Sequence, residues 1–494
     1  MTALQERLHA ARAVVDRIPK GLYIDGEWRP SRSGATVSVE DPGTGTVIAE
    51  VADAGPADAV DALDAAVRAQ ASWAATPPRE RGEVLSRAFE TIMARKDDLA
   101  LLMTLEMGKP FAESQAEVAY AAEFLRWFSE EAVRIDGGYM TAPGGGSRVV
   151  TMRQPVGPCL LVTPWNFPMA MGTRKIGPAL AAGCTVVVKP AKQTPLSMLA
   201  LVDILREAGA PAGVVNVFTT NRSGEVTDHL LNDPRLRKLS FTGSTEVGRA
   251  LLAASSRNVL RTSMELGGNA PFLVFADADL DAAVEGAFQA KMRNIGEACT
   301  AANRFYVHSS VADEFGRRLA ERLAALTVGH GLDPATQVGP LIDANAVKNV
   351  TDLVSEAAAA GATVLTGGTE VASDGHFFAP TVLSGVPLGA RTLTEEIFGP
   401  VAPIVAFDDE DTAVALANDS EYGLAGYLFT ESLSRGLRVS ERLECGMVGL
   451  NQGIISNPAA PFGGVKQSGL GREGGAVGID EYLSIKYLAI KADR

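Results

Sequence analysis

The sequence has few cysteines, few aromatic residues and no long apolar run. Its 494 residues include four cysteines and 6% aromatic residues. No two cysteines form a CxxC pair, which disfavours both a zinc site and a disulfide scaffold. No apolar run reaches the ~18 residues that a transmembrane helix needs. We therefore expect a protein that holds no metal and does not span a membrane.

Basic residues are outnumbered by acidic ones, 45 to 59. The formal net charge is −14, and no Lys/Arg cluster is present to attract nucleic acid or an anionic membrane surface. Residues 1–20 mix acidic and basic side chains with Ala and Val, as an amphipathic helix does and a secretion signal does not. These features predict a cytoplasmic protein that binds neither nucleic acid nor membranes. Capture of an anionic substrate would require local cations, because the net charge repels it at long range.

Strand-like and helix-like segments alternate along much of the chain, which is too long for one hydrophobic core. Strands are predicted at 158–163, 185–189, 214–219 and 238–242, with helices at 176–182, 196–208 and 246–254. A second series has strands at 272–275 and 304–308 and helices at 280–291 and 311–326. Such alternation predicts parallel βαβ units in two α/β domains. The Gly-rich stretch 137–146 is predicted to be a turn between two β-like segments.

Three separate segments supply a thiol, a carboxylate and an amide. Cys299 lies among small and polar residues just before a predicted strand, whereas Cys159 and Cys184 have the apolar or small neighbours of buried thiols. Glu265 lies close to a pair of glycines, which permit close approach of a ligand, and Asn166 follows a tryptophan. A thiol can attack a carbonyl, an amide can hold the oxyanion and a carboxylate can activate water. The set predicts covalent oxidation of an aldehyde to an acid.

Gly243 and Ser244 lie in a segment that follows a predicted strand and opens a predicted helix. The free N–H groups and partial positive charge of a helix N-terminus suit a pyrophosphate. Lys189 and Lys192 lie at the end of another predicted strand, and nucleotides bind at the carboxyl edge of such sheets. Taken alone, each signal has a structural alternative. Ser244 can be a simple helix cap, and the lysines can be solvated surface residues.

Motifs spread nearly from end to end resemble the NAD(P)-dependent aldehyde dehydrogenase superfamily. Besides the segments around Asn166, Glu265 and Cys299, they lie at 106–110, 338–341, 395–400 and 461–464. The resemblance implies a Rossmann-like nucleotide-binding domain at 1–132 and 156–264, an α/β catalytic domain at 265–466, and a small β-hairpin oligomerisation domain at 133–155 and 467–494. It also implies a homodimer or homotetramer, because the hairpin of this fold extends a neighbouring subunit's sheet.

The same resemblance implies a role for each candidate residue. Cys299 is the nucleophile, Asn166 and the Cys299 backbone N–H form the oxyanion hole, and Glu265 activates the water that releases the acid. The implied cofactor residues are Trp165, Lys189, Lys192, Gly243, Ser244 at the pyrophosphate, Leu266, Glu396 on the nicotinamide ribose and Phe398 beside it.

Three positions depart from the pattern of many relatives. Glu297 stands where relatives commonly have Gln, and a carboxylate facing the site would slightly disfavour the thiolate. Ala301 stands where some relatives have a second Cys, so their redox disulfide is not expected here. Lys192 stands where NAD-preferring relatives often have Glu. A cation there predicts that NADP is used and preferred, with NAD as a weaker alternative.

Arg174, Arg293 and Ser456 indicate a substrate with a remote carboxylate. Arg binds carboxylates in a bidentate way, and Ser adds a hydroxyl donor. The three residues make the chain similar to succinate-semialdehyde dehydrogenases, which predicts oxidation of succinate semialdehyde to succinate. Alternatives are glutarate semialdehyde or another carboxylated aldehyde, a broad-specificity enzyme, a CoA-acylating relative and a non-catalytic family member. For either arginine, a structural salt bridge is the alternative.

Overall fold

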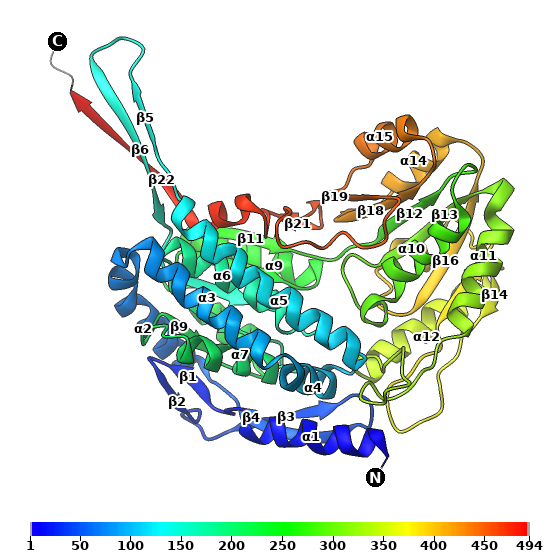
Figure 1. The fold of residues 1–494 in the computed structure, drawn as a ribbon, viewed down its shortest axis with the longest axis horizontal. Coiled ribbons are helices and arrows are strands. Elements are labelled where there is room, and N and C mark those ends of the chain that lie inside the picture. Colours follow the sequence, from blue (N-terminus) through cyan, green and yellow to red (C-terminus); the bar gives the residue numbers. More distant parts are fainter. Residues whose placement is uncertain (1, 492–494) are drawn as a thin grey trace.

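The protein consists of two α/β halves and a projecting β-arm (Figure 1). The computed structural model describes residues 2–491. Residue 1 and residues 492–494, which the expected domain boundaries include, lie outside the described residues. The first half contains an eight-stranded sheet and the second a seven-stranded sheet.

The eight-stranded sheet has the order β2-β1-β9-β8-β7-β10-β11-β21. Its strands are β1 Leu22–Ile24, β2 Glu27–Arg29, β7 Cys159–Val162, β8 Val186–Lys189, β9 Val215–Val217, β10 Lys238–Thr242, β11 Arg261–Glu265 and β21 Gly469–Leu470. The strands from β9 to β11 run parallel. The chain builds outward from β7 through β8 to β9 and then returns to the other side of β7 with β10. This reversal creates a topological switch point between β7 and β10.

Helices cover both faces of this sheet, because its central strands are apolar on both sides. Along β7, Cys159 and Leu161 join one core, and Leu160 and Val162 join the other, as the two-residue period of a strand requires. The first core contains α1 Ala3–Arg17, α3 Pro78–Ala94, α4 Lys96–Met107, α5 Phe111–Glu131, α6 Ala170–Ala182 and α7 Leu196–Glu207. The second contains α2 Pro56–Ala75, α8 Ser223–Leu231 and α9 Thr245–Ser255.

The seven-stranded sheet has the order β14-β15-β16-β13-β12-β18-β19. Its strands are β12 Ala270–Val274, β13 Ala302–His308, β14 Thr363–Thr366, β15 Thr381–Ser384, β16 Val401–Phe407, β18 Ala425–Phe429 and β19 Met447–Leu450. All neighbours run parallel except β14 and β15. The helices packed in its core are α10 Leu280–Met292, α11 Ser309–Ala324, α12 Ala344–Ala359, α13 Arg391–Thr394, α14 Glu410–Asn418 and α15 Leu433–Arg442.

The arm is an antiparallel sheet of β5 Gly138–Thr141, β6 Ser147–Pro155 and β22 Leu483–Lys491. Nearly all of β22 is exposed, including Ile485 at 73% and Tyr487 at 60%. The prediction that the whole stretch 137–146 is a turn was wrong, since β5 lies inside it. Gly138 pairs with Thr151, and a Cβ on that glycine would lie 2.7 Å from the Thr151 Oγ1. Here glycine permits close strand pairing instead of a turn.

The remaining short elements connect these parts. They are the hairpin β3 Thr36–Asp41 and β4 Thr46–Ala52, the pair β17 Tyr422–Gly423 and β20 Val465–Lys466, and the 3-10 turns η1 Ala132–Arg134, η2 Ser256–Asn258, η3 Arg293–Gly296 and η4 Ala476–Tyr482.

The strands and helices predicted between residues 158 and 326 are confirmed, and the largest boundary error is at α6. This helix begins at Ala170, six residues earlier than the predicted 176. The carboxylate of Glu117 accepts hydrogen bonds from the backbone N–H groups of Met169 and Ala170. A cap supplied by a distant helix leaves no local signal in the sequence.

Candidate active site

A cavity of about 230 Å³ lies at the switch point, beyond the carboxyl ends of β7, β10 and β11. Predicted site residues on its wall are Trp165, Asn166, Gly243, Ser244, Leu266, Cys299, Glu396 and Phe398. Pro164, Phe167, Met171, Thr242 and Gly267 complete the wall. Loops of the first half thus meet loops of the second half around one space, at the place where open α/β sheets bind ligands.

Asn166 follows β7, and its amide is held at both ends. Its Nδ2 donates to the carbonyl oxygen of Glu297 at 2.9 Å, and its Oδ1 accepts from the Phe167 N–H at 3.2 Å. Its backbone oxygen accepts from Lys109 Nζ at 2.7 Å and from Asn294 Nδ2 at 3.1 Å. An amide nitrogen carries two hydrogens, so one remains for an oxyanion.

Cys299 is half-buried in the loop between η3 and β13. Gly268 packs against it so closely that a Cβ on that glycine would lie 2.1 Å from the Cys299 carbonyl oxygen. Burial raises the pKa of the Cys299 thiol to about 12, while the positive charges of Arg174 and Arg293 act in the opposite direction. The resting thiol is therefore protonated, and attack on a carbonyl requires loss of that proton.

Glu265 ends β11 and is 2% exposed. Neither of its carboxyl oxygens has a hydrogen-bond partner among the described residues. Burial raises the pKa of Glu265 well above its ordinary value, and Glu473 adds to the rise, whereas Arg174 and Lys175 oppose it. A buried carboxyl with a raised pKa and unoccupied oxygens is the kind of group that enzymes use as a general base.

The wall of the cavity beside α9 carries groups of the kinds that bind the parts of a dinucleotide. Ser244 caps α9 with its hydroxyl, and the N-terminus of this helix offers N–H groups and partial positive charge to phosphates. Glu396 accepts from the Gly268 N–H at 3.0 Å, and burial raises its pKa to about 7. Trp165 and Phe398 pack edge to face, with ring centroids 5.4 Å apart. These groups suit a pyrophosphate, ribose hydroxyls and a nicotinamide ring respectively.

The two predicted lysines lie at the neighbouring end of β8. Lys189 is buried, and its Nζ donates to the Pro190 oxygen at 3.2 Å and to the Ser223 hydroxyl at 3.1 Å. Burial lowers the pKa of Lys189 to about 8. Lys192 is exposed and donates to Asn221 Oδ1 at 3.2 Å. Both lie at the carboxyl edge of the sheet, as expected. Their roles in cofactor binding stay predictions.

The predicted substrate residues fall into two groups. Arg293 Nη1 donates to Ser456 Oγ at 2.9 Å, so the fold brings these two together. Arg174 lies within α6 at 1% exposure, its Nε 2.5 Å from Glu473 Oε2 and its guanidinium 4.1 Å from the centre of the Phe462 ring. The salt bridge that the sequence left as an alternative is thus present for Arg174. The substrate role of all three residues stays a prediction.

Glu297 and Ala301 differ in what they do beside the nucleophile. Glu297 is fully buried, and its Oε1 accepts from the Ile342 N–H at 3.0 Å. Burial raises the pKa of Glu297 well above its ordinary value, which weakens the charge repulsion that this group can exert on a thiolate. Ala301 brings no second thiol, and all four cysteines of the chain are free.

Several residues that support the site were missed at the level of sequence. Lys109 and Glu117 form a buried ion pair, with Nζ and Oε2 2.5 Å apart, directly behind Asn166. Glu473 pairs with both Arg174 and Lys175. The motif at 106–110 was noticed in the sequence, but it did not show which loop it would contact.

A nucleophilic thiol, an amide donor and a buried carboxyl at a nucleotide-binding edge define an enzyme that oxidises its substrate through a covalent thiol adduct. Within residues 2–491, no group of three or more His, Cys, Asp or Glu side chains is placed to hold a metal ion. No helix in the described part of the chain is long and apolar enough to cross a membrane.

Comparison with known proteins agrees with that class. The model of the aldehyde dehydrogenase family matches residues 28–488. The chain therefore belongs to the aldehyde dehydrogenase family, and the predicted fold class is confirmed.

Curated relatives span almost the whole chain. A succinate-semialdehyde dehydrogenase of Paenarthrobacter nicotinovorans is 60% identical over 90% of this chain and 99% of its own length. A glutarate-semialdehyde dehydrogenase of Pseudomonas putida is 51% identical, with 95% and 97% covered. An NADP-dependent succinate-semialdehyde dehydrogenase of Escherichia coli is 49% identical, with 94% and 97% covered.

Solved structures show the same fold. A succinate-semialdehyde dehydrogenase from Burkholderia pseudomallei has a TM-score of 0.95 at 49% identity, covering 96% of this chain and 98% of its own. A betaine aldehyde dehydrogenase from Staphylococcus aureus, solved with NAD+, has a TM-score of 0.96 at 33% identity, covering 98% and 97%.

Proposed function

We propose that this protein oxidises succinate semialdehyde to succinate, with NADP as the preferred hydride acceptor and NAD as a weaker one. The main support is that the predicted nucleophile, the amide donor and all predicted cofactor residues except Lys189 and Lys192 share one cavity. The positive charges of Arg174 and Arg293 oppose the rise in the pKa of the Cys299 thiol, which supports a role for these cations close to the proposed nucleophile. Similarity to succinate-semialdehyde dehydrogenases supports the same substrate.

The roles of the residues follow from the chemistry of the step. Glu265, the candidate base, takes the proton of the Cys299 thiol and then passes it to solvent. The thiolate attacks the aldehyde carbon, while Asn166 and the Cys299 backbone N–H hold the oxyanion of the thiohemiacetal. The nicotinamide cofactor, when bound at this cavity, supplies a hydride acceptor. Loss of hydride from the thiohemiacetal leaves a thioester on Cys299. Glu265 takes a proton from water, whose oxygen displaces the sulfur and releases the acid.

Cofactor preference is proposed to depend on Lys192. Its exposed ammonium adds positive charge at the β8 edge, where the 2′-phosphate of NADP carries negative charge. An exposed pair of this kind is worth only about 1 kcal/mol, so NAD should still be accepted. Lys192→Glu should shift the ratio of kcat/KM values toward NAD. If the wild type has a higher kcat/KM with NAD, and Lys192→Glu leaves the ratio unchanged, Lys192 does not determine the cofactor preference.

Glutarate semialdehyde is the second candidate substrate, favoured by the similarity to a glutarate-semialdehyde dehydrogenase. One methylene changes binding by only ~1–3 kcal/mol, so both aldehydes should react to some extent. Arg293 and Ser456 are proposed to hold the remote carboxylate, since their hydrogen bond gives a cation and a hydroxyl at one place.

The arm is proposed to pair subunits into a homodimer or homotetramer. Its strand β22 exposes apolar side chains along an open sheet edge, which a second copy of the chain would cover. The same proposal divides the chain into three parts: a cofactor domain at 1–132 and 156–264, a catalytic domain at 265–466, and oligomerisation segments at 133–155 and 467–494.

The proposed location is the cytoplasm. The four free thiols suit it, because thiols stay reduced there.

Initial rates of reduced-cofactor formation test the function directly. The panel should contain succinate semialdehyde, glutarate semialdehyde and an uncharged aldehyde of similar length, each with NADP and with NAD. The highest kcat/KM is expected for succinate semialdehyde with NADP, and Cys299→Ala should abolish the reaction. A higher value for the uncharged aldehyde would contradict the proposed substrate, and turnover by Cys299→Ala would contradict the nucleophile. Release of free acid without CoA separates hydrolysis from acyl transfer to CoA.

A further inference from the structure

Lys109 connects the motif at 106–110 to the catalytic amide. We propose that Lys109 is a positioning residue: its ammonium, held by Glu117, fixes the backbone of Asn166 and thereby aims the amide at the oxyanion. This inference deepens the proposed function, because it rests on Asn166 as the oxyanion donor.

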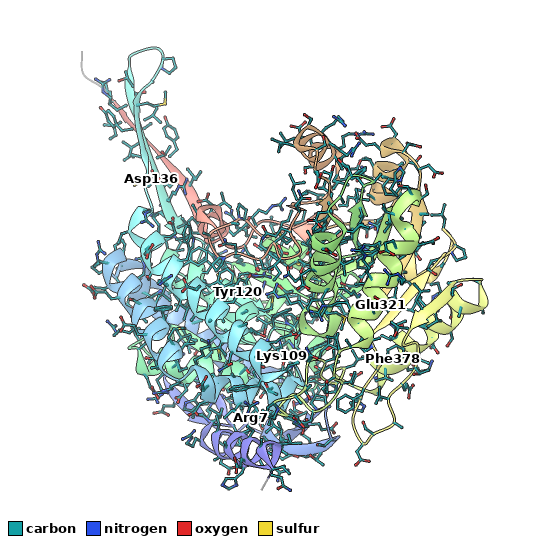
Figure 2. All side chains as sticks on the ribbon, turned by 45° about the vertical axis from the view of Figure 1, so that its right-hand side comes forward. Arg7, Lys109, Tyr120, Asp136, Glu321 and Phe378 are labelled. Atoms are coloured by element: carbon teal, nitrogen blue, oxygen red, sulfur yellow. The ribbon has the colours of Figure 1, made fainter. Side chains whose placement is uncertain are left out.

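The first observation is the direct contact between Lys109 and the loop that carries Asn166. Lys109 Nζ lies 2.7 Å from the Asn166 carbonyl oxygen and 4.2 Å from the centre of the Phe167 ring. The Lys109 side chain is 1% exposed. Figure 2 shows Lys109 in the body of the molecule and Asp136 at the base of the arm. A buried charge-assisted hydrogen bond to a backbone oxygen restrains the peptide plane that carries the amide side chain.

The second observation is that Glu117 fixes the ammonium and the far end of the same loop together. Its Oε2 lies 2.5 Å from Lys109 Nζ. Its Oε1 accepts from the N–H groups of Met169 at 3.1 Å and Ala170 at 3.2 Å, at the start of α6. One carboxylate thus links the Asn166 carbonyl oxygen, through Lys109, to the end of the same loop at α6.

The third observation is a link from α5, the helix that carries Glu117, to the loop of Cys299. The backbone oxygen of Asn166 also accepts from Asn294 Nδ2. The backbone N–H of Asn294 donates to Glu113 Oε2 at 2.6 Å. Glu113 and Glu117 are four residues apart and so lie on one face of α5. That face holds the amide loop and the loop leading to Cys299 against each other.

Stability alone is a poor account of this ion pair. Burial lowers the pKa of Lys109, and the charge of Glu117 opposes that shift. Desolvation offsets much of the attraction in a buried pair, so an apolar pair of similar volume is often as stable. An apolar pair, however, would remove the charged donor to the Asn166 carbonyl oxygen and leave only the neutral amide of Asn294 among the described donors.

The test compares Lys109→Met with the double variant Lys109→Met/Glu117→Gln. The single variant leaves a buried carboxylate without its partner and should lower both stability and rate. The double variant removes both charges, so its thermal midpoint should recover most of the loss. The pre-steady-state rate of reduced-cofactor formation should stay about 10- to 100-fold below wild type in both variants, because the oxyanion donor is misplaced. KM values for aldehyde and cofactor should change far less than this rate.

Two further measurements separate positioning from general damage. In an Asn166→Ala background, Lys109→Met should change the rate by less than about threefold, since no amide remains to be placed. Lys238→Met is the matched control, because Lys238 is a buried lysine that contacts Ser263 and Glu481. Lys238→Met should lower the thermal midpoint. For an equal drop in midpoint, its rate should fall much less than the rate of Lys109→Met.

Recovery of the rate together with stability in the double variant would overturn the proposal, as would an undiminished effect of Lys109→Met in the Asn166→Ala background. The rate is measured with an uncharged aldehyde as well as with succinate semialdehyde. A wild type that oxidises only the uncharged aldehyde would refute the proposed substrate and still leave the Lys109 effect measurable.

Discussion

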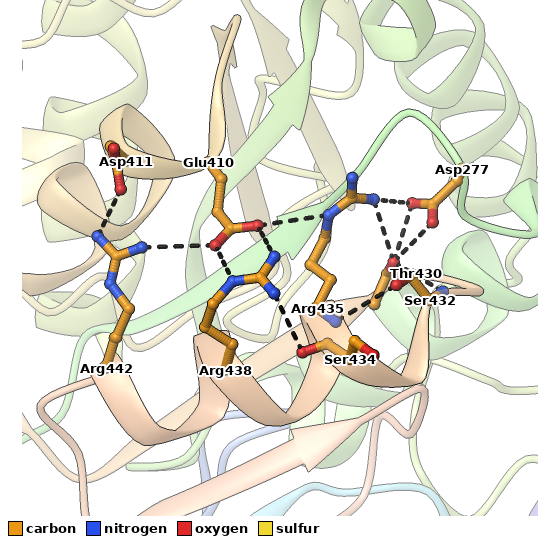
Figure 3. A network of polar contacts seen from close by, with 9 residues as sticks. All are labelled: Asp277, Glu410, Asp411, Thr430, Ser432, Ser434, Arg435, Arg438 and Arg442. Atoms are coloured by element: carbon orange, nitrogen blue, oxygen red, sulfur yellow. Dashed lines mark hydrogen bonds and ion pairs between the residues drawn. The ribbon is translucent and has the colours of Figure 1, made fainter.

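Two networks of charged side chains in this molecule differ mainly in their access to water. On the surface, Glu410 of α14 contacts Arg435, Arg438 and Arg442 of α15 (Figure 3). Glu410 is 22% exposed there and Arg438 53%. Behind the catalytic cavity, Glu473 contacts Arg174 and Lys175, and these side chains are 4%, 1% and 0% exposed.

The comparison teaches that the consequence of an ion pair depends on its access to water more than on how many pairs the network contains. Water screens the surface network, and each exposed pair of this kind contributes little to stability. Inside the protein the same charges cannot be solvated, so each depends on its partner and influences the pKa of its neighbours. The buried network is therefore expected to respond strongly to substitution, and the surface network weakly.

The largest effect is expected for Glu265→Gln, which removes the carboxyl beside the buried network. Hydrolysis of the thioester should slow by about 10²- to 10⁴-fold, with a larger burst of reduced cofactor before steady state. Since burial raises the pKa of Glu265, the wild-type carboxyl is protonated at low pH and becomes a base as the pH rises. Wild-type hydrolysis should thus accelerate as the pH rises through the raised pKa of Glu265, whereas the variant should lack this dependence. Equal pH profiles would contradict Glu265 as the base.

Glu473→Gln should have the next largest effect, on stability. It leaves Arg174 and Lys175 as buried cations without a carboxylate, which typically costs about 3–5 kcal/mol. The matched control is Glu410→Gln on the surface, for which denaturation at the same protein concentration should show a much smaller change. Burial alone would raise the pKa of Glu473, but Lys175 and Arg174 bring it below its ordinary value. The stabilisation is therefore present above the unfolded-state pKa and is lost as the pH falls through the folded-state pKa. Similar losses for both variants would remove the distinction between the networks.

Arg293→Ala tests a half-buried cation between these extremes. Loss of one charge-assisted contact should raise KM for succinate semialdehyde roughly 10- to 150-fold, or about 1.5–3 kcal/mol. An uncharged aldehyde should be affected much less. Arg435→Ala, in the surface network, serves as the control and should leave both KM values unchanged. An equal loss for charged and uncharged aldehydes would assign Arg293 to structure.

What the sequence predicted, and what it missed, follows the same division. Alternating apolar runs predicted both sheets, because strand and helix periods are local properties. The motif resemblance named Cys299, Asn166 and Glu396 as site residues, and the structure brings all three to one cavity wall. The partner of Arg174 was not predictable, since Glu473 lies far away in the sequence and reaches it only after folding. Lys109 was noticed within a motif, yet its contact with Asn166 depends on how α4 and α5 pack beside β7.

The smallest effect is expected for Arg438→Ala in the surface network. The two ends of its guanidinium contact Glu410 at 2.8 and 2.7 Å, a geometry as good as that of many buried pairs. Arg435 and Arg442 remain beside Glu410 in the variant, so the carboxylate keeps cationic neighbours. Because water also replaces the lost contact, the thermal midpoint should change by no more than about 2 °C, and kinetic constants should not change. A larger drop that disappears at high salt would show that good geometry can make an exposed network behave as a unit, and the contrast with Glu473 would then rest on geometry instead of on water.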